Sequence, residues 1–230
     1  MGGEWVEGYA DPTQDDGWQP QSGQRAGVPP DDASTPPEQQ LDYSHLHAPN
    51  ELWQRRYFQH CNFSQADLSG LRTLQCTFVE CNFSAAGFDH SQHRLSAFHS
   101  CTFLGAQLAS STFEECRFAG SAFDSAQMAG VVFRGADLTS VSLTGVDLSG
   151  VDLSEARLYG ADLSRANLSN ATLVGADLRE VRLDQTNFED ADLQGALIDG
   201  FDPLRARLSG ARFDPEQCVV LVQAFGVVVG

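Results

Sequence analysis

The stretch ADLTSVSLTGVDLSGVDLSEARLYGADLSRANLSNATLVGADL, residues 136–178, repeats a pattern every five residues. Each unit holds a small residue, then in most units a polar residue, then a Leu, then two further residues that are mostly polar or Gly. On both sides of this stretch the same register continues, from Phe58 to Phe213. Of its 32 central positions thirteen are Phe and fourteen are Leu, and just Thr73, His93 and Pro203 are not large apolar residues. A pattern kept over so many units predicts a repeat architecture.

The five-residue period also predicts the shape of the repeat. Three extended residues point their first and third side chains inward and the second outward, so the small and the large residue face the core. The last two residues turn a corner, and twelve units place Gly at the second of them, where a positive φ costs little. Four such sides close a coil of about 20 residues, and the coils stack at about 4.8 Å. The fold class is therefore an all-β, right-handed quadrilateral β-helix, a solenoid of pentapeptide units over residues 51–213.

Both ends of the chain depart from this pattern. Residues 1–50 are rich in Pro, Gln, Asp and Gly, and this composition predicts a disordered acidic tail. Residues 214–230 begin with Asp214, Pro215 and Glu216, an acid at the N-cap, Pro at the first helical position and a second acid. We expect a capping helix to about Phe225 that stops at Gly226, followed by a short strand over residues 227–229.

The C-terminal helix is apolar almost all round, which is more than a simple cap requires. A solenoid end needs a cover, and a single small helix cannot hide so much apolar surface. A two-fold dimer interface is the favoured interpretation, with a simple cap as the alternative. The residues expected in this homodimer interface are Cys218, Val219, Leu221, Val222 and Phe225.

The charge of the chain limits its partners. Asp and Glu number 31 against 14 basic residues, all of them Arg, for a formal net charge of -17. Such a surface repels nucleic acid and membrane phosphates and attracts basic proteins. The N-terminus lacks the features of a signal peptide, and no run of 18 apolar residues predicts a membrane span. We expect a cytoplasmic protein with no direct nucleic-acid or membrane binding.

Cysteine and histidine are the residues that could suggest chemistry. Five of the six Cys (Cys61, Cys76, Cys81, Cys101 and Cys116) fall at the small inward position, which favours structural filler over metal ligands or disulfides. His93 takes a central inward position, and a buried, hydrogen-bonded His is favoured over a metal ligand because His90 and His99 face outward on other sides. The sequence contains no recognisable catalytic, metal-binding or cofactor-binding motif. We therefore expect that the protein is not an enzyme and has no metal site or cofactor.

One side of the predicted coil concentrates the negative charge. The units centred on Leu68, Phe88 and every twentieth residue after them have a net charge of -4, against -2, -1 and -1 for the other sides. Such a side keeps a rod soluble, or it presents a row of carboxylates to a basic DNA-binding groove much as duplex phosphates do. The candidate partner-binding residues, opposed on this side by Arg207 alone, are Asp67, Asp89, Asp147, Glu189 and Asp190.

The A(D/N)LXX units over residues 58–213 resemble the pentapeptide-repeat superfamily. The segment SQHRLSAF at residues 91–98, the uninterrupted register and the ending DPEQ at residues 214–217 resemble the MfpA type, which is related to the Qnr type. This resemblance implies a dimeric DNA mimic that binds DNA gyrase, inhibits it or protects it from fluoroquinolones. Two alternatives remain: a scaffold for another protein partner with no topoisomerase role, or self-protection against a topoisomerase poison made by a neighbouring pathway.

Overall fold

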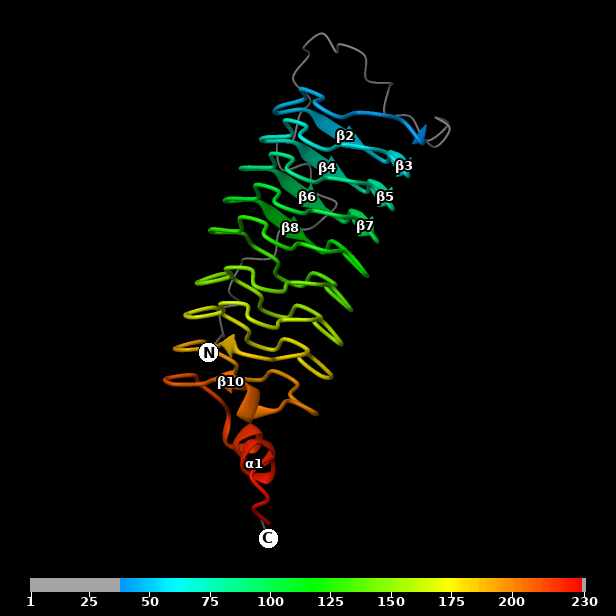
Figure 1. Cartoon of the computed structure of the whole chain (residues 1–230). Helices are drawn as coiled ribbons and strands as arrows, with labels where there is room; N and C mark the ends of the chain where they lie inside the picture. The colour runs from blue at the N-terminus through cyan, green and yellow to red at the C-terminus, as the bar shows by residue number, and fades with distance from the viewer. Residues whose placement is uncertain (1–37, 229–230) are drawn as a thin grey trace, which may run out of the picture.

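The computed structural model describes residues 38–228 and shows a parallel β-solenoid of about eight turns followed by one short helix (Figure 1). The expected tail over residues 1–37 lies outside this range. The elements are β1 (Glu38–Gln39), β2 (Leu52–Gln54), β3 (Tyr57–Gln59), β4 (Arg72–Leu74), β5 (Thr77–Val79), β6 (Gln92–Arg94), β7 (Ala97–His99), β8 (Thr112–Glu114), β9 (Thr186–Asn187), the 3-10 helix η1 (Pro203–Arg205), β10 (Ala206–Arg207) and α1 (Pro215–Gln223).

The strands pair along the solenoid axis. One sheet has the order β2-β4-β6-β8, a second has β1-β3-β5-β7, and β9 pairs with β10. All pairs are parallel, and each residue lies opposite its equivalent in the next coil, as in Thr73 opposite His93 and His93 opposite Phe113. Between and beyond these strands, single bridges keep the same spacing as far as Asp192 and Arg212. This register confirms that four pentapeptide units make one coil.

The core is a column of stacked side chains. At its N-terminal end, Phe rings of successive coils stack face to face, with centroids 4.9 Å apart for Phe58 and Phe78 and 4.8 Å apart for Phe78 and Phe98. Leu fills most central positions from Leu138 to Leu193, and all of these Leu side chains are buried. Small residues two positions earlier fill the space between the large ones, as close packing requires.

Pro203 interrupts the column without breaking it. Pro203 occupies a central position and starts η1, while Phe201 occupies the small position two residues before it. Both are buried, and the Phe201 ring lies 5.8 Å from the ring of Phe188 in the preceding coil. The large ring at the small position thus compensates for the short Pro at the large one.

The corners adopt the left-handed conformation whether or not they hold Gly. Gly145 has a φ of 69°, but Leu95 and Asn170, at the same position in other units, have φ values of 52° and 57°. The coil geometry imposes this conformation on the units from residue 40 to residue 210, except at Arg205 in η1, and Gly makes it less costly where it occurs.

The solenoid begins before the expected boundary at residue 51. Glu38 of β1 pairs with Phe58 of β3, and Asp42 and His47 form bridges to the following coil. Residues 38–50 therefore belong to the first coil and are not part of a tail. The sequence conceals this coil because its central positions hold Glu38 and Tyr43, with Ala48 after them, in place of Phe or Leu.

The C-terminal segment forms the expected helix but not the expected strand. α1 starts at Pro215 after the N-cap Asp214, and it ends at Gln223, short of the predicted end at Phe225. Ala224 to Gly226 form a turn, and Val227 and Val228 lie in no strand, while residue 229 lies outside the described range. A strand needs a neighbour with which to pair, and Val227 and Val228 have no such partner in the part of the chain that the structure describes.

Candidate functional site

The predicted acidic residues lie on one side of the solenoid, here named the acidic side and defined by the carboxylates Asp67, Asp89, Asp147, Glu189 and Asp190. Bridges connect the outward residues of this side from coil to coil, including His47 to Asp67 and Gln127 to Asp147. Because each step is one coil of about 4.8 Å, the carboxylates occupy four different coils along the axis, and Glu189 and Asp190 share one of them. The structure therefore brings the five acids onto one side but spreads them along its length.

Asp67 stands near the N-terminal end of the acidic side. Its Oδ2 lies 2.8 Å from Nδ1 of His47, and its Oδ1 accepts a hydrogen bond of 2.7 Å from the Ser69 hydroxyl. The Ser69 hydroxyl holds the pKa of Asp67 below its ordinary value, so this carboxylate is ionised at neutral pH. His47 and Asp67 are both well exposed, so the pair is a surface contact of small energy.

Asp147 is held by amide donors along the same side. Its Oδ1 accepts from the side chain of Asn167 at 3.0 Å and from the backbone N–H of Ser149 at 3.1 Å. Asn187 in turn donates to Asn167 at 3.0 Å. This row of amides fixes the position of the Asp147 carboxylate without cancelling its charge.

The remaining three carboxylates of the acidic side lie in two other coils of the solenoid. Asp89 accepts a hydrogen bond of 3.0 Å from the backbone N–H of Ala109 in the next coil. Glu189 and Asp190 follow one another at a corner near the C-terminal end, where Asp190 is exposed and has a φ of 57°. Negative charge is therefore presented at both ends and in the middle of the acidic side.

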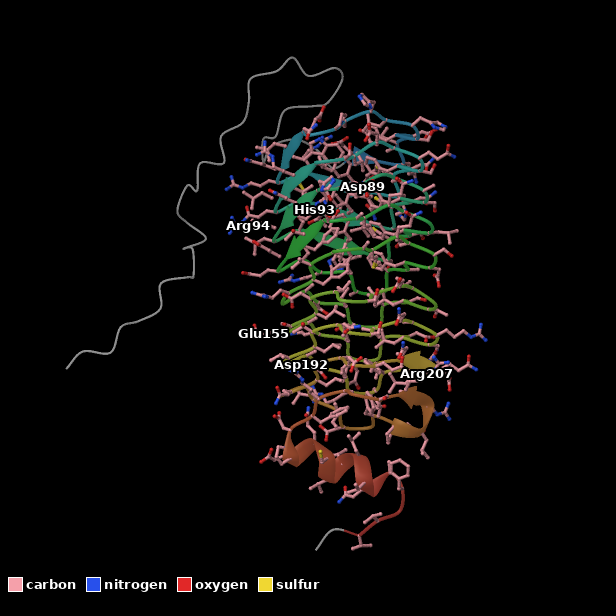
Figure 2. The ribbon with its side chains drawn as sticks, turned by 90° about the vertical axis from the view of Figure 1, so that its left-hand side faces the viewer. Asp89, His93, Arg94, Glu155, Asp192 and Arg207 are labelled. Carbon is pink, nitrogen blue, oxygen red and sulfur yellow. The ribbon has the colours of Figure 1, made fainter. Side chains whose placement is uncertain are left out.

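Arginine distinguishes the other three sides from the acidic side. On those sides several Arg residues pair with a carboxylate of a neighbouring position, as in Arg94–Glu114 at 3.2 Å and Arg179–Asp177 at 2.8 Å. Figure 2 shows Arg94, Glu155 and Asp192 along one edge of the solenoid and Arg207 extending from the opposite edge. Further pairs of this kind are Arg134–Asp152, Arg182–Asp162, Arg205–Asp184, Arg205–Asp202 and Arg212–Asp192.

The acidic side lacks such pairs within residues 38–228. Among the described ion pairs, none joins an Arg to one of its five carboxylates, and its one Arg, Arg207, lies in the last coil beside Asn187. The charge of -4 is therefore displayed to solvent, whereas many acids of the other sides are neutralised by contact. Chemically, this surface suits a basic partner.

His93 is buried and hydrogen-bonded, as expected. Its Nδ1 lies 2.8 Å from the Thr73 hydroxyl, its Nε2 lies 2.9 Å from the Ser91 hydroxyl, and its ring stacks on Phe113 with centroids 4.6 Å apart. Burial lowers the pKa of His93 to about 3, so the ring is neutral at physiological pH. Over the described residues, no group of three or more His, Cys, Asp or Glu is arranged to hold a metal ion.

The five cysteines at small positions are buried, and Cys218 is exposed. The Cys101 thiol donates to the carbonyl of Phe78 in the preceding coil, and the hydroxyls of Ser111 and Ser121 make the same type of contact at 2.7 Å. Cysteine thus fills a slot in which Ser is equally accommodated. Burial raises the pKa of the Cys116 thiol to about 12, which leaves it protonated and unreactive.

The C-terminal helix places four of the five expected interface residues in solvent. Cys218, Val219, Val222 and Phe225 are exposed, whereas Leu221 is half-buried and packs against the solenoid core. Leu221 therefore belongs to the inner face of α1. Two residues that the sequence pattern had assigned to a strand extend the exposed apolar surface: Val227, 51% exposed, and Val228, 93% exposed. Gln217, the buried residue of α1, also carries no signal in the sequence pattern.

No helix within the described range is long and apolar enough to cross a membrane.

Comparison with known proteins identifies the repeat independently. The family model described as pentapeptide repeats matches in eight copies, over residues 101–139, 116–154, 147–185, 161–200 and 186–214. The chain is similar to the pentapeptide repeat protein MfpA of Mycolicibacterium smegmatis, with 40% identity over 52 residues, and to MfpA of Mycobacterium tuberculosis, with 43% identity over 53 residues. Each match covers 23% of this chain, and the chain spans 27% and 29% of the length of these relatives.

Solved structures match over a longer range. A trypsin-treated form of QnrB1, a plasmid-mediated fluoroquinolone resistance protein, superposes with a TM-score of 0.77 at 24% identity, covering 84% of this chain and 96% of QnrB1. Full-length QnrB1 superposes with a TM-score of 0.72 at 22% identity, covering 84% of this chain and 100% of QnrB1. These matches show a shared fold.

Proposed function

The chain is a pentapeptide-repeat protein of the MfpA and Qnr type, and from this premise we propose that it binds DNA gyrase as a mimic of duplex DNA. Occupation of the basic DNA-gate surface would inhibit the enzyme, protect it from fluoroquinolones or a related topoisomerase poison, or do both. The proposal involves no chemical step and no cofactor. Because it requires contact with DNA gyrase, it also implies that the protein is cytoplasmic.

The observation that carries the proposal is that, within residues 38–228, no Arg forms an ion pair with a carboxylate of the acidic side. On the other sides, pairs such as Arg134–Asp152 at 2.6 Å reduce the outward field. On the acidic side Asp67 and Asp147 contact His, Ser and Asn side chains instead. A basic groove would therefore meet, along one side, carboxylates that no Arg of residues 38–228 compensates, and it meets the phosphates of a duplex in a similar way.

We further propose a homodimer formed through the C-terminal ends. Val219, Val222 and Phe225 are 37%, 39% and 60% exposed and leave an apolar surface beyond the last coil. A second copy related by a two-fold axis presents the same surface, and the two together cover it. Two solenoids joined end to end would span roughly 75 Å, comparable to about 22 base pairs of duplex at about 3.4 Å each.

The test is a gyrase supercoiling assay with the purified protein, with and without a fluoroquinolone. The charge variant replaces the five acidic-side residues by Asn or Gln. A matched control makes the same five-charge change on the other sides, at residues paired with Arg. The control positions are Glu114, Asp152, Asp162, Asp177 and Asp192.

We expect the acidic-side variant to lose inhibition at least tenfold in effective concentration, while the matched control keeps it within about threefold, because the control removes charges that Arg already compensates. Equal losses in the two variants would contradict a specific role for the acidic side and indicate bulk charge. No effect of the unaltered protein on supercoiling or on drug sensitivity would refute the gyrase proposal and favour a scaffold for another partner.

A further inference from the structure

Apart from the bond from Gln185 to the carbonyl of Arg205 in η1, the backbone hydrogen bonds between coils follow two fixed offsets. In one, an N–H donates to a carbonyl of the preceding coil, one position before its own bridge partner, as in Leu197 to Ala176 at 2.8 Å. In the other, an N–H donates to a carbonyl of the following coil, one position before the equivalent residue, as in Gly175 to Gln194 at 3.0 Å. Each coil therefore needs the next one to satisfy its exposed backbone edge.

The last coil has no following coil, because the chain turns into α1. By the same two offsets, a further coil would pair the N–H of residue 217 with the carbonyl of Ala196, and the N–H of Gly195 with the carbonyl of residue 214. Those two backbone groups belong to α1 instead, where the Asp214 carbonyl accepts from the N–H of Cys218 at 3.1 Å.

Side chains of the same two residues take over both bonds. Nε2 of Gln217 donates to the carbonyl of Ala196 at 2.7 Å, and Oδ2 of Asp214 accepts from the N–H of Gly195 at 2.5 Å. The side-chain amide and carboxylate thus stand where a backbone N–H and a backbone carbonyl would stand in another coil.

The remaining capacity of Gln217 is also used. Nε2 donates to the carbonyl of Leu193 at 2.8 Å, and Oε1 accepts from the backbone N–H of Asp214 at 2.6 Å. Gln217 is 8% exposed and is the buried residue of α1. Its side-chain amide bonds to three backbone groups, two carbonyls of the solenoid and one N–H at the start of the helix. These bonds fix the first turn of the helix against the solenoid.

We propose that Asp214 and Gln217 are positioning residues: they replace the missing coil and thereby set the orientation of α1. In that orientation Val220 and Leu221 pack on the core, while Val219 and Val222 face outward. The part of this inference that concerns dimerisation rests on the proposed function. The part that concerns the attachment of α1 rests on the contacts alone.

Two variants of Gln217 separate hydrogen bonding from size. Gln217→Ala removes all three contacts. Gln217→Glu keeps the shape and the acceptor but replaces the donor by a second carboxylate oxygen facing the carbonyls of Ala196 and Leu193, which is repulsive. Gln223→Ala is the matched control, since Gln223 is an exposed residue at the end of the same helix.

The experiment measures amide hydrogen exchange over α1, the dimer dissociation constant by sedimentation, and the thermal midpoint of the solenoid, all in the full chain. We expect both Gln217 variants to exchange the amides of Val219 to Val222 at least tenfold faster and to dimerise at least tenfold more weakly. The solenoid midpoint stays within a few degrees of the unaltered protein, and Gln223→Ala changes none of the three.

Three outcomes would overturn the inference. Unchanged exchange over α1 in both Gln217 variants would show that these contacts do not hold the helix. A parallel loss of the solenoid midpoint would show a general stabilising role in place of positioning. Faster exchange with unaltered dimerisation would refute the link to the interface. If the unaltered protein is a monomer at all concentrations, the proposed dimer fails, and the exchange measurement still decides whether Gln217 positions α1.

Discussion

The hydroxyl of Thr73 lies 2.8 Å from Nδ1 of His93, its partner one coil away in the β4–β6 pair. Thr73 also lies 2.9 Å from the Ser96 hydroxyl, and Ser91 lies 3.2 Å from the Ser111 hydroxyl. A connected polar group therefore occupies an otherwise apolar column of rings. Each member has a partner, so the column tolerates the group at this level.

The first prediction concerns the pH dependence of stability. Folded His93 has a pKa of about 3, whereas an exposed His titrates near 6.5, so the unfolded chain binds more protons between these values. The contribution of His93 is complete above pH 6.5 and falls as the pH decreases toward 3, by up to about 1.4 kcal/mol per pH unit. Urea unfolding at a series of pH values measures this slope.

His93→Phe provides the control for that slope. A Phe ring continues the stack on Phe113, and Thr73 and Ser91 keep the hydroxyl partners Ser96 and Ser111. We expect a loss of about 1–3 kcal/mol at pH 7 from the lost hydrogen bonds, and a shallower slope below pH 6.5. An unchanged slope would assign the acid sensitivity to other groups.

The second prediction concerns salt. If the acidic side meets a basic surface, binding to gyrase weakens as ionic strength rises, because salt screens exposed charges beyond about 10 Å at 0.1 M. We expect a loss of at least tenfold between 50 and 300 mM salt, and a clearly shallower dependence when Asp67, Asp147 and Glu189 are changed to Asn or Gln. Affinity measured by surface plasmon resonance tests this, and a salt-independent affinity would contradict electrostatic recognition.

The third prediction concerns the C-terminal surface. The double change Val222→Asp and Phe225→Asp puts two charges into the proposed dimer interface, so we expect a monomer by sedimentation with an unaltered solenoid midpoint. Cys218 reports the same event, since it is exposed in the single chain while the other thiols are buried. One thiol of the six should react rapidly with a thiol reagent in the double variant and slowly in the unaltered dimer. Equal reaction rates would argue against an interface at α1.

The fourth prediction concerns the small inward position. Ala161 is fully buried in a close-packed column, so Ala161→Leu should cost about 1–3 kcal/mol through overpacking. Cys101→Ser should be nearly neutral, because Ser121 fills the equivalent slot of the next coil and donates to the carbonyl of Phe98. Gln107→Leu, at an exposed outward position, is the control. Denaturant midpoints compare the three.

Much of the fold could be predicted because each unit repeats one local rule. The five-residue register predicted the coil, the buried cysteines and the buried His93, since inward and outward positions follow from the backbone alone. The first coil could not be predicted in this way. It buries Arg56 and Glu38 as an ion pair, with the Arg56 guanidinium 4.7 Å from the Trp53 ring, and such a pairing has no periodic signature.

The site was less accessible to sequence than the fold. The register placed Asp67 and Asp147 on one side, but it could not show that arginines elsewhere reach across coils, as Arg134 does to Asp152. Which carboxylate an Arg contacts depends on the rotamers of both side chains. Gln217 was missed for a related reason: its role follows from its offset to the carbonyl of Ala196, which becomes visible once the hydrogen bonds between coils are known.

The constant length of the coils, together with the side-chain closure at Asp214, makes the length of this molecule adjustable by genetic change. Removing the residues of one whole coil brings each remaining unit opposite a partner of the same kind, and the closing contacts of the last coil are unaffected if the deletion lies before it. The distance between two carboxylates can therefore change in steps of about 4.8 Å without redesign of the fold. Pentapeptide-repeat proteins that differ by whole coils would therefore differ in length by fixed steps. Each would fit a partner groove of the corresponding length.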